Sequence, residues 1–270
     1  MTWGGIPGGR ASRGTEMHTS PAQAATELST LGLCTLGVVT VGQAPRDDLV
    51  PELVHLLPPC RIVQRGGLDG LSAADIEALA PRPGEHPLTS RLADGSSAVF
   101  GHDQSVPLVE RAVAAAEDDG ADVVLVVCSG SFPTLRHRRP LLLAETLAHH
   151  AVAGLAGGAR VAIVRPLLSQ LDDARLAWAR TLGRPVAAAA ASPYTDSLEA
   201  IAASAASIAE HADLLVLDCI GYDERMRRAA ALVANRPVLL VRSLAARLAG
   251  ELVTRGRTEQ PMLGDDHRPA

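Results

Sequence analysis

Two cysteines in similar sequence contexts could carry out acid–base chemistry on a carbon atom. Cys128 and Cys219 end the segments 122–130 (DVVLVVCSG) and 213–221 (DLLVLDCIG), which both place Cys-x-Gly after a short apolar run. Two thiols on opposite faces of a carbon can remove a proton from one face and return it to the other. The alternative is that both cysteines pack as small apolar side chains, because free Cys is among the most buried residue types.

The expected positions of these thiols favour ionisation. Each apolar run reads as a parallel strand, and ligands of α/β proteins bind outside the carboxyl ends of such strands. Each cysteine is followed by Gly and then by the start of a predicted helix. Free amide groups and the positive end of a helix dipole lower the pKa of a thiol. We therefore predict a lowered pKa for Cys128 and Cys219.

Polar residues follow the predicted strand 35–41 at the same edge of the sheet. Arg46 could hold a carboxylate or phosphate in its planar fork, with help from Gln43. Pro45 stiffens the turn that carries them. The alternative is a plain strand-to-helix turn in which Asp47 caps the helix.

A third segment at this edge follows the predicted strand 185–190 and offers hydroxyl groups to a substrate. It contains Ser192 and Tyr194, although Thr195 could equally cap the next helix. Tyr222, the other tyrosine, stands just after the second Cys-x-Gly motif. The complete predicted set of substrate-binding residues is Gln43, Pro45, Arg46, Ser129, Gly130, Ser131, Ser192, Tyr194, Ile220, Gly221 and Tyr222.

Composition excludes several chemistries. All 25 basic residues are arginine, so a lysine Schiff base with pyridoxal phosphate and a Walker-type phosphate loop are both excluded. None of the four cysteines forms a Cys-x-x-Cys pair, which argues against a structural zinc site. No cofactor and no metal are therefore expected.

Charge and hydropathy restrict the partners and the compartment. The net charge of −5 and the 2% of aromatic residues argue against nucleic-acid binding, which needs a basic face or stacking platforms. No apolar run reaches the roughly 18 residues that span a membrane, and the scattered cysteines fit a reducing compartment. We expect a cytoplasmic protein that binds a small carboxylate, with a homodimer as the default assembly.

Short apolar runs alternate with helical patterns along most of the chain, which predicts parallel sheets covered by helices on both faces. The expected strands are 35–41, 61–65, 122–128, 159–164, 185–190, 213–219 and 237–241. The expected helices are 46–57, 72–80, 104–119, 140–153, 169–182, 195–210, 223–234 and 243–254.

The two Cys-x-Gly segments suggest an internal duplication. We expect an α/β fold of two Rossmann-like lobes with parallel sheets, related by a pseudo-twofold axis. Segments 88–92 and 96–100 flank Asp94-Gly95 and predict a β-hairpin inserted in the first lobe. The predicted division of the chain is a disordered tail over 1–30, lobe 1 over 31–155, lobe 2 over 156–254 with the substrate cleft between the lobes, and a flexible tail over 255–270.

Six motifs together resemble the AroM family over residues 35–254. In chain order they are VGQAPRD at 41–47, RGGLDGL at 65–71, CSG at 128–130, RRP at 138–140, ASPY at 191–194 and LDCIGY at 217–222. The family is similar to the aspartate/glutamate racemase superfamily, which includes amino-acid and hydantoin racemases, maleate isomerase and arylmalonate decarboxylase. The resemblance implies two Rossmann-like lobes with the site between them.

The same resemblance implies that Cys128 and Cys219 are the acid/base or nucleophilic pair. In the enzymes of the superfamily the corresponding cysteines are usually followed by Asn-Thr or Thr, whereas here Ser129 and Ile220 follow them. This difference weakens the case for amino-acid racemisation. Three hypotheses follow. They are a cofactor-independent racemase or isomerase with two cysteines, a cis–trans isomerase or decarboxylase with one cysteine, and a non-catalytic protein that binds a metabolite of aromatic metabolism.

Overall fold

The computed structural model describes residues 34–253, so the tails predicted over 1–30 and 255–270 lie outside the described residues. The strands are β1 (Thr35–Thr40), β2 (Arg61–Gly66), β3 (Pro87–Arg91), β4 (Ser97–Gly101), β5 (Val123–Val127), β6 (Leu141–Leu143), β7 (Val161–Arg165), β8 (Ala187–Ala190), β9 (Leu214–Leu217) and β10 (Val238–Leu240). The helices are α2 (Val50–Val54), α3 (Ala73–Glu77), α4 (His102–Asp118), α5 (Ala144–Ala156), α6 (Leu171–Leu182), α7 (Leu198–Ser207), α8 (Glu224–Ala234) and α9 (Val241–Val253), with short 3-10 turns at Leu168–Gln170 and Ala209–His211.

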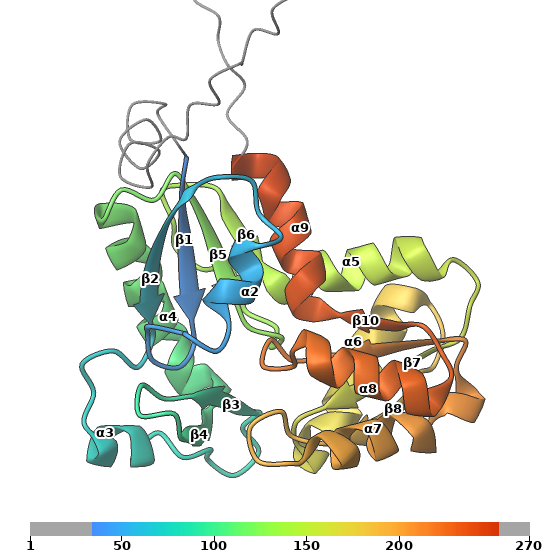
Figure 1. The fold of residues 1–270 in the computed structure, drawn as a ribbon. Coiled ribbons are helices and arrows are strands. Elements are labelled where there is room, and N and C mark those ends of the chain that lie inside the picture. Colours follow the sequence, from blue (N-terminus) through green and yellow to red (C-terminus); the bar gives the residue numbers. More distant parts are fainter. Residues whose placement is uncertain (1–33, 254–270) are drawn as a thin grey trace, which may run out of the picture. The chain divides into compact units, whose positions relative to one another are not determined.

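The described residues are organised around two parallel four-stranded sheets (Figure 1). The first has the order β2-β1-β5-β6 and the second, read from its other edge, has the order β8-β7-β9-β10. Strand for strand the two orders are the same, with β5 and β9 at equivalent places. The expected α/β class with parallel sheets in two lobes is confirmed, and the equivalent orders support a duplication.

Burial explains the composition of the central strands. Every residue of β5 is buried, and β5 pairs with β1 on one side and β6 on the other. A strand covered on both faces has no solvent side, so it reads as a continuous run of valine and leucine rather than an alternation.

The predicted hairpin is present as β3 and β4, which pair antiparallel. The turn is closed by Leu92 N–H donating to the Ser96 carbonyl at 2.8 Å. Gly95 has φ +85°, a conformation that costs glycine little and other residues more. The hairpin lies between β2 and α4 in the chain, as an insertion into the first lobe.

The sequence interpretation of residues 140–153 as one helix was wrong at its start. Leu141–Leu143 form β6 and pair parallel with β5, and α5 begins only at Ala144. Three leucines before a helix fit a buried strand and a buried helical turn equally well, because periodicity cannot separate the two over so short a run.

The last helix of each half packs against the other sheet. On α5, Ala148 and Val152 belong to the apolar cluster of β7 and Trp178, whereas on α9, Ala245 and Ala249 belong to the cluster of β1. The two helices also contact each other. The division of the chain near residue 155 remains a prediction, and the packing crosses it in both directions.

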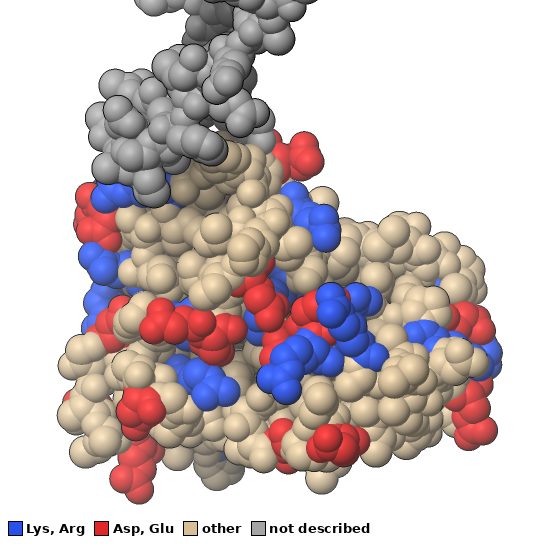
Figure 2. Space-filling view, in the orientation of Figure 1, with Lys and Arg blue, Asp and Glu red and all other residues tan. Residues whose placement is uncertain are grey.

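Charges of both signs intermingle on the face that Figure 2 shows, where basic side chains lie beside acidic ones. On α8, for example, Glu224 pairs with Arg227 and Arg228. None of the helices described between residues 34 and 253 is long and apolar enough to cross a membrane.

Candidate active site

The two cysteines of the repeated motif come together at one small cavity. Cys128 follows β5 in the first sheet and Cys219 follows β9 in the second. Both line a cavity of about 20 Å³, together with Arg165 at the end of β7. The two residues are 8% and 6% exposed, so a reactant would meet these thiols out of bulk water.

Each thiol accepts a hydrogen bond from the amide two residues further on. Gly130 N–H donates to Cys128 Sγ at 3.2 Å, and Gly221 N–H donates to Cys219 Sγ at 3.4 Å. The two Cys-x-Gly turns therefore share one local geometry. An amide that points at sulfur stabilises the thiolate relative to the thiol.

The peptide that carries each of these amides is held at its carbonyl by an arginine. Arg165 donates to the Ser129 carbonyl at 3.0 Å, and Arg242 donates to the Ile220 carbonyl at 3.1 Å. Arg242 also donates to Gly221 O at 3.1 Å and to Glu52 at 2.8 Å. These bonds fix the direction in which both amides point.

The prediction of a lowered thiol pKa was wrong. Burial raises the pKa of Cys128 to about 12, against smaller lowering effects of the Gly130 amide and Arg165. Burial also raises the pKa of Cys219. No helix begins directly after either thiol, since residues 129–140 are irregular and α8 starts five residues after Cys219. The expected contribution of a helix dipole is therefore missing, and desolvation dominates.

The two thiols have different neighbours. The Tyr194 hydroxyl lies 3.7 Å from Cys219 Sγ, and Arg165 and Arg46 both lower the pKa of Cys219 against the effect of burial. Cys128 has only Arg165 in this role, and the charges of Cys219 and Glu145 raise its pKa further. Cys219 is thus better equipped to exist as a thiolate.

Arg165 is the charged group common to both thiols. Its Nη1 lies 3.0 Å from Asp218 Oδ2, and the same oxygen accepts a hydrogen bond from Trp178 Nε1 at 2.7 Å. The Arg165 side chain is 11% exposed and that of Asp218 1%. This buried pair holds a guanidinium in the wall of the thiol cavity.

Arg46, predicted to bind a substrate anion, is engaged inside the protein. It forms a two-point ion pair with Asp48, at 2.7 and 2.9 Å, and its Nη1 donates to Thr40 at 3.0 Å. Gln43 ties its turn to the hairpin, because its Oε1 accepts from Ala93 N–H at 2.9 Å. Pro45 is exposed in that turn.

Three other predicted hydroxyls are distributed differently. Ser192 Oγ accepts a hydrogen bond from the Tyr194 amide at 3.2 Å, and the Tyr222 hydroxyl donates to the Ala191 carbonyl at 2.5 Å. Ser131 lines a second, larger cavity. The Tyr194 hydroxyl, by contrast, lies within 3.7 Å of a thiol sulfur.

The glycines of the two motifs allow close packing over the thiols. A Cβ atom on Gly221 would lie 2.6 Å from the Tyr194 ring, and one on Gly130 would lie 2.8 Å from Leu88 Cδ2. Ile220 lines the thiol cavity. Gly130 and Ser129 line both cavities.

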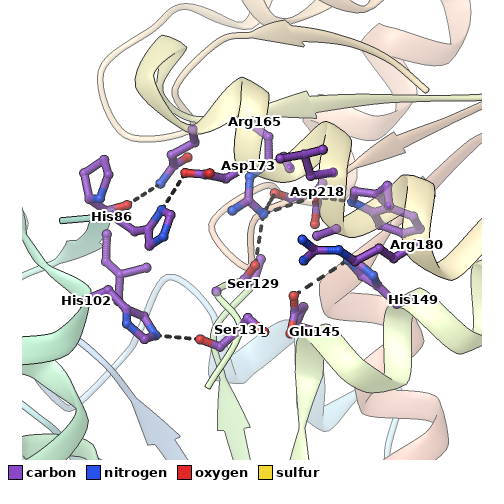
Figure 3. A pocket seen from close by; sticks show the side chains of 18 residues that line it. His86, His102, Ser129, Ser131, Glu145, His149, Arg165, Asp173, Arg180 and Asp218 are labelled. Atoms are coloured by element: carbon purple, nitrogen blue, oxygen red, sulfur yellow. Dashed lines mark hydrogen bonds and ion pairs between the residues drawn. The ribbon is translucent and has the colours of Figure 1, made fainter. Parts of the chain in front are cut away.

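The second cavity has a volume of about 320 Å³ and shares Leu88, Ser129, Gly130, Arg165 and Gln170 with the thiol cavity. Figure 3 shows Arg165 reaching toward Ser129 and Asp218, with Glu145 and His149 on neighbouring turns of α5.

Two titratable groups of this cavity are shifted toward their neutral forms. Burial, reinforced by the charge of Asp218, raises the pKa of Glu145 to about 7. Burial lowers the pKa of His149, which stacks on Trp178 with ring centroids 3.8 Å apart.

Among the polar cavity residues that sequence reasoning missed are Arg165, Gln170, Asp218 and Glu145. The strongest available signal was Asp218, a carboxylate inside an apolar strand, since a buried charge requires a partner. Arg165 stands one residue beyond the predicted strand 159–164, at the edge where ligands bind. Nothing local marks Glu145, because β6 was not recognised.

Within residues 34–253, no group of three or more His, Cys, Asp or Glu side chains could hold a metal ion. The donors at the thiol cavity are instead the two amides that point at the sulfurs and the guanidinium of Arg165. Such groups recognise anions.

Comparisons with known proteins agree with this architecture. Residues 36–253 match the family described as AroM protein. No sequence among the curated proteins matches the chain. A structure of aspartate racemase from Picrophilus torridus is 13% identical with a TM-score of 0.54, over 82% of this chain and 95% of that one.

Two further structures are similar in fold. An arylmalonate decarboxylase is 14% identical with a TM-score of 0.55, over 82% of this chain and 93% of that chain. A glutamate racemase from Francisella tularensis, in complex with D-glutamate, is 12% identical with a TM-score of 0.54, over 82% and 81% of the two chains. At these identities the comparison concerns the fold.

Proposed function

The chain belongs to the AroM family, and from this premise we propose that it is a cofactor-independent racemase or isomerase that acts on a small carboxylate through Cys128 and Cys219. The observation that carries the proposal is that both thiols line one cavity beside a buried guanidinium. Neighbours in fold include racemases of aspartate and glutamate. These neighbours support an acidic substrate with a proton on the carbon next to its carboxylate.

In this mechanism one thiolate removes the proton from the substrate carbon and the opposite thiol delivers its own proton to the other face. The electron pair of the broken C–H bond moves into the carboxylate, where Arg165 would stabilise the added charge. After one turnover the two sulfurs have exchanged protonation states. The reaction consumes no other reactant.

Proton exchange at carbon tests the proposal. The protein is incubated in D2O with amino acids, hydantoins, 2-substituted malonates and maleate, and deuterium uptake and turnover are followed by NMR. We expect Cys128→Ser and Cys219→Ser each to lower exchange by about a hundredfold or more, the usual contribution of a general acid or base.

Cys60→Ser is the matched control. Cys60 immediately precedes β2, at the amino-terminal edge of the first sheet, far along the strands from the thiol cavity. This variant should keep the wild-type rate. If both site variants also kept it, the two-thiol mechanism would be wrong.

A single-cysteine reaction, cis–trans isomerisation or decarboxylation, is the second candidate. The unequal neighbours of the two thiols favour it, since Tyr194 and Arg46 act on Cys219 alone. In that case only Cys219 would react rapidly with iodoacetamide at neutral pH. Turnover without deuterium exchange into recovered substrate would support this candidate over the first.

A further inference from the structure

Glu145 stands beside Cys128 at the carboxyl edge of the first sheet. β5 and β6 are parallel neighbours, with Val126 opposite Leu143, and Cys128 and Glu145 each follow that pair by two residues. Because neighbouring strands lie only about 5 Å apart, a thiol and a carboxyl at these positions leave the sheet side by side. Burial is the main cause of the raised pKa of Cys128, and the charge of Glu145 adds to it.

The second sheet has a residue of opposite charge at the equivalent position. β10 pairs with β9 so that Leu240 lies opposite Leu217, and Arg242 and Cys219 follow these leucines by two residues. A cation beside a thiol favours the thiolate, whereas an anion favours the thiol. The duplicated fold therefore places an acid beside the one cysteine and a base beside the other.

Glu145 also lines the larger cavity, which adjoins the thiol cavity because Ser129 and Gly130 belong to the walls of both. At another part of its wall the side chains of His86 and Asp173 are more than half exposed, so the cavity opens to solvent there. Its volume of about 320 Å³ has room for several water molecules. A proton can therefore pass between solvent and the Glu145 carboxyl.

The Glu145 carboxyl is balanced between its two forms. Burial raises its pKa to about 7, so the acid and the carboxylate are both populated at neutral pH. The charged and polar groups around it come from α4, α5, α6, the hairpin, β7 and the turns after β5 and β9. They are Asp218, whose charge adds to the effect of burial, Arg165, Ser131 and His102, which oppose it, and His86, His149, Asp173 and Arg180, which line the same cavity.

We propose that Glu145 is the proton reservoir of Cys128, a positioning residue that returns a proton to the Cys128 thiolate after each turnover. This inference rests on the proposed function, with Cys219 as the base and Cys128 as the acid. The carboxylic acid of Glu145 gives its proton to sulfur, becomes a carboxylate and regains a proton from solvent through the larger cavity. Cys219 releases to solvent the proton that it took from the substrate, so the protein returns to its starting state.

Thiol reactivity tests the link between the two residues without a substrate. The whole protein is labelled with iodoacetamide between pH 6.5 and 9, and peptide mapping gives the rate at each cysteine. We expect Glu145→Gln to speed the labelling of Cys128 by at least about threefold at pH 9, because no carboxylate then opposes the thiolate. Toward the acid end wild-type Glu145 becomes neutral, so the two rates should converge. Cys219 should keep its wild-type rate throughout.

Turnover tests the return of the proton. With a panel compound that the wild type converts, Glu145→Gln should lower the steady-state rate at neutral pH by about tenfold or more. The first turnover should keep its wild-type rate, because Cys128 begins protonated. A merely structural role of Glu145 would change first and later turnovers alike.

Two further variants serve as controls. Glu145→Asp keeps a carboxyl group and should restore much of the steady-state rate. Asp172→Asn removes the same charge from a 94% exposed side chain of α6, and it should change neither the labelling of Cys128 nor turnover.

The outcomes separate this proposal from the proposed function. If the wild type converts a compound and Glu145→Gln either sustains the wild-type steady-state rate or leaves the labelling of Cys128 at pH 9 unchanged, the reservoir is overturned and the two-thiol reaction stands. If the wild type converts no compound, the two-thiol reaction and the return of the proton fall together. The labelling then still decides whether Glu145 governs the ionisation of Cys128.

Discussion

The two halves of the thiol site follow one plan but surround their sulfurs differently. In both, a strand ends in Cys-x-Gly, and the glycine amide donates to the thiol. Around Cys219 stand Tyr194, Arg46 and Arg165, whereas Cys128 has Arg165 alone as a neighbouring cation. The repeated fold places the sulfurs, and the loops particular to each half decide which one ionises first. In the reaction proposed above, Cys219 would therefore act as the first base and Cys128 as the first acid.

The helices that follow the outer strands extend this contrast. Glu145 is the second residue of α5, and Arg242 is the second residue of α9, the equivalent helix of the other half. Arg242 is buried and holds the Cys219 turn. Glu145, with opposite charge, lines the larger cavity. At equivalent positions of the two halves, therefore, a basic residue stabilises the turn of one cysteine and an acidic residue forms part of a cavity wall.

The largest effect is expected where the two halves share a residue. Arg165→Met would leave Asp218 buried without its ion-pair partner. The free energy of unfolding, measured by chemical denaturation, should fall by about 3–5 kcal/mol. Adding Asp218→Asn should recover much of that loss, because the uncompensated charge disappears. An Arg165→Met protein as stable as wild type would show that the pair is not needed in the fold.

Alkaline pH should destabilise the protein through the Cys128 half. Its thiol has a folded pKa of about 12 against 9.0 for the free group, so the neutral thiol is favoured in the native state and the unfolded state ionises first. The stabilisation is complete below pH 9 and should fall by about 2 kcal/mol between pH 8 and 10.5. Denaturation midpoints across this range, compared with those of Cys128→Ala, measure the effect. Parallel profiles for the two proteins would contradict it.

A methyl group added at the two motif glycines should have unequal effects. In Gly221→Ala the new Cβ meets the Tyr194 ring at 2.6 Å, whereas in Gly130→Ala its nearest contact is the end of Leu88 at 2.8 Å. A rigid ring cannot yield as a leucine methyl can, so Gly221→Ala should cost about 1–3 kcal/mol and Gly130→Ala distinctly less. Thermal melting of both variants makes the comparison, and equal losses would mean that the Cys219 turn is no tighter than the Cys128 turn.

The smallest effect should appear in thiol reactivity. Tyr194→Phe removes the hydroxyl near Cys219 Sγ, which raises the pKa of this thiol further and should slow its alkylation by iodoacetamide about fivefold, the worth of one ordinary hydrogen bond. Cys128 should react as before. Peptide mapping of each cysteine gives both rates, and a change at Cys128 alone would reverse the assignment of base and acid.

Much of this architecture could be predicted because it depends on patterns that the chain repeats. Apolar runs such as 122–128 and 213–219 predict buried strands, and the Asp94-Gly95 pair predicts a hairpin turn. The three leucines of β6 carried no periodicity that could separate strand from helix.

The pKa of Cys128 could not be predicted from its neighbours in sequence. It depends on how completely the hairpin and the second lobe cover it, which is a tertiary property. Arg46 shows a similar limit, since its type and position suggested an anion site and only the fold reveals its pairing with Asp48.

The exchange of α5 and α9 between the sheets has a consequence for synthesis of the chain. The strands of the first sheet have all been made once Leu143 emerges from the ribosome, yet α9, which packs with Leu36 and Val38, follows the whole second sheet in the chain. Until α9 has been made, an apolar face of that sheet stays exposed. In the same way α5 cannot bury its apolar side before β7 and β9 have been translated. Neither half can bury its core before the other has been synthesised, so the two halves should fold together as one cooperative unit once α9 has been made.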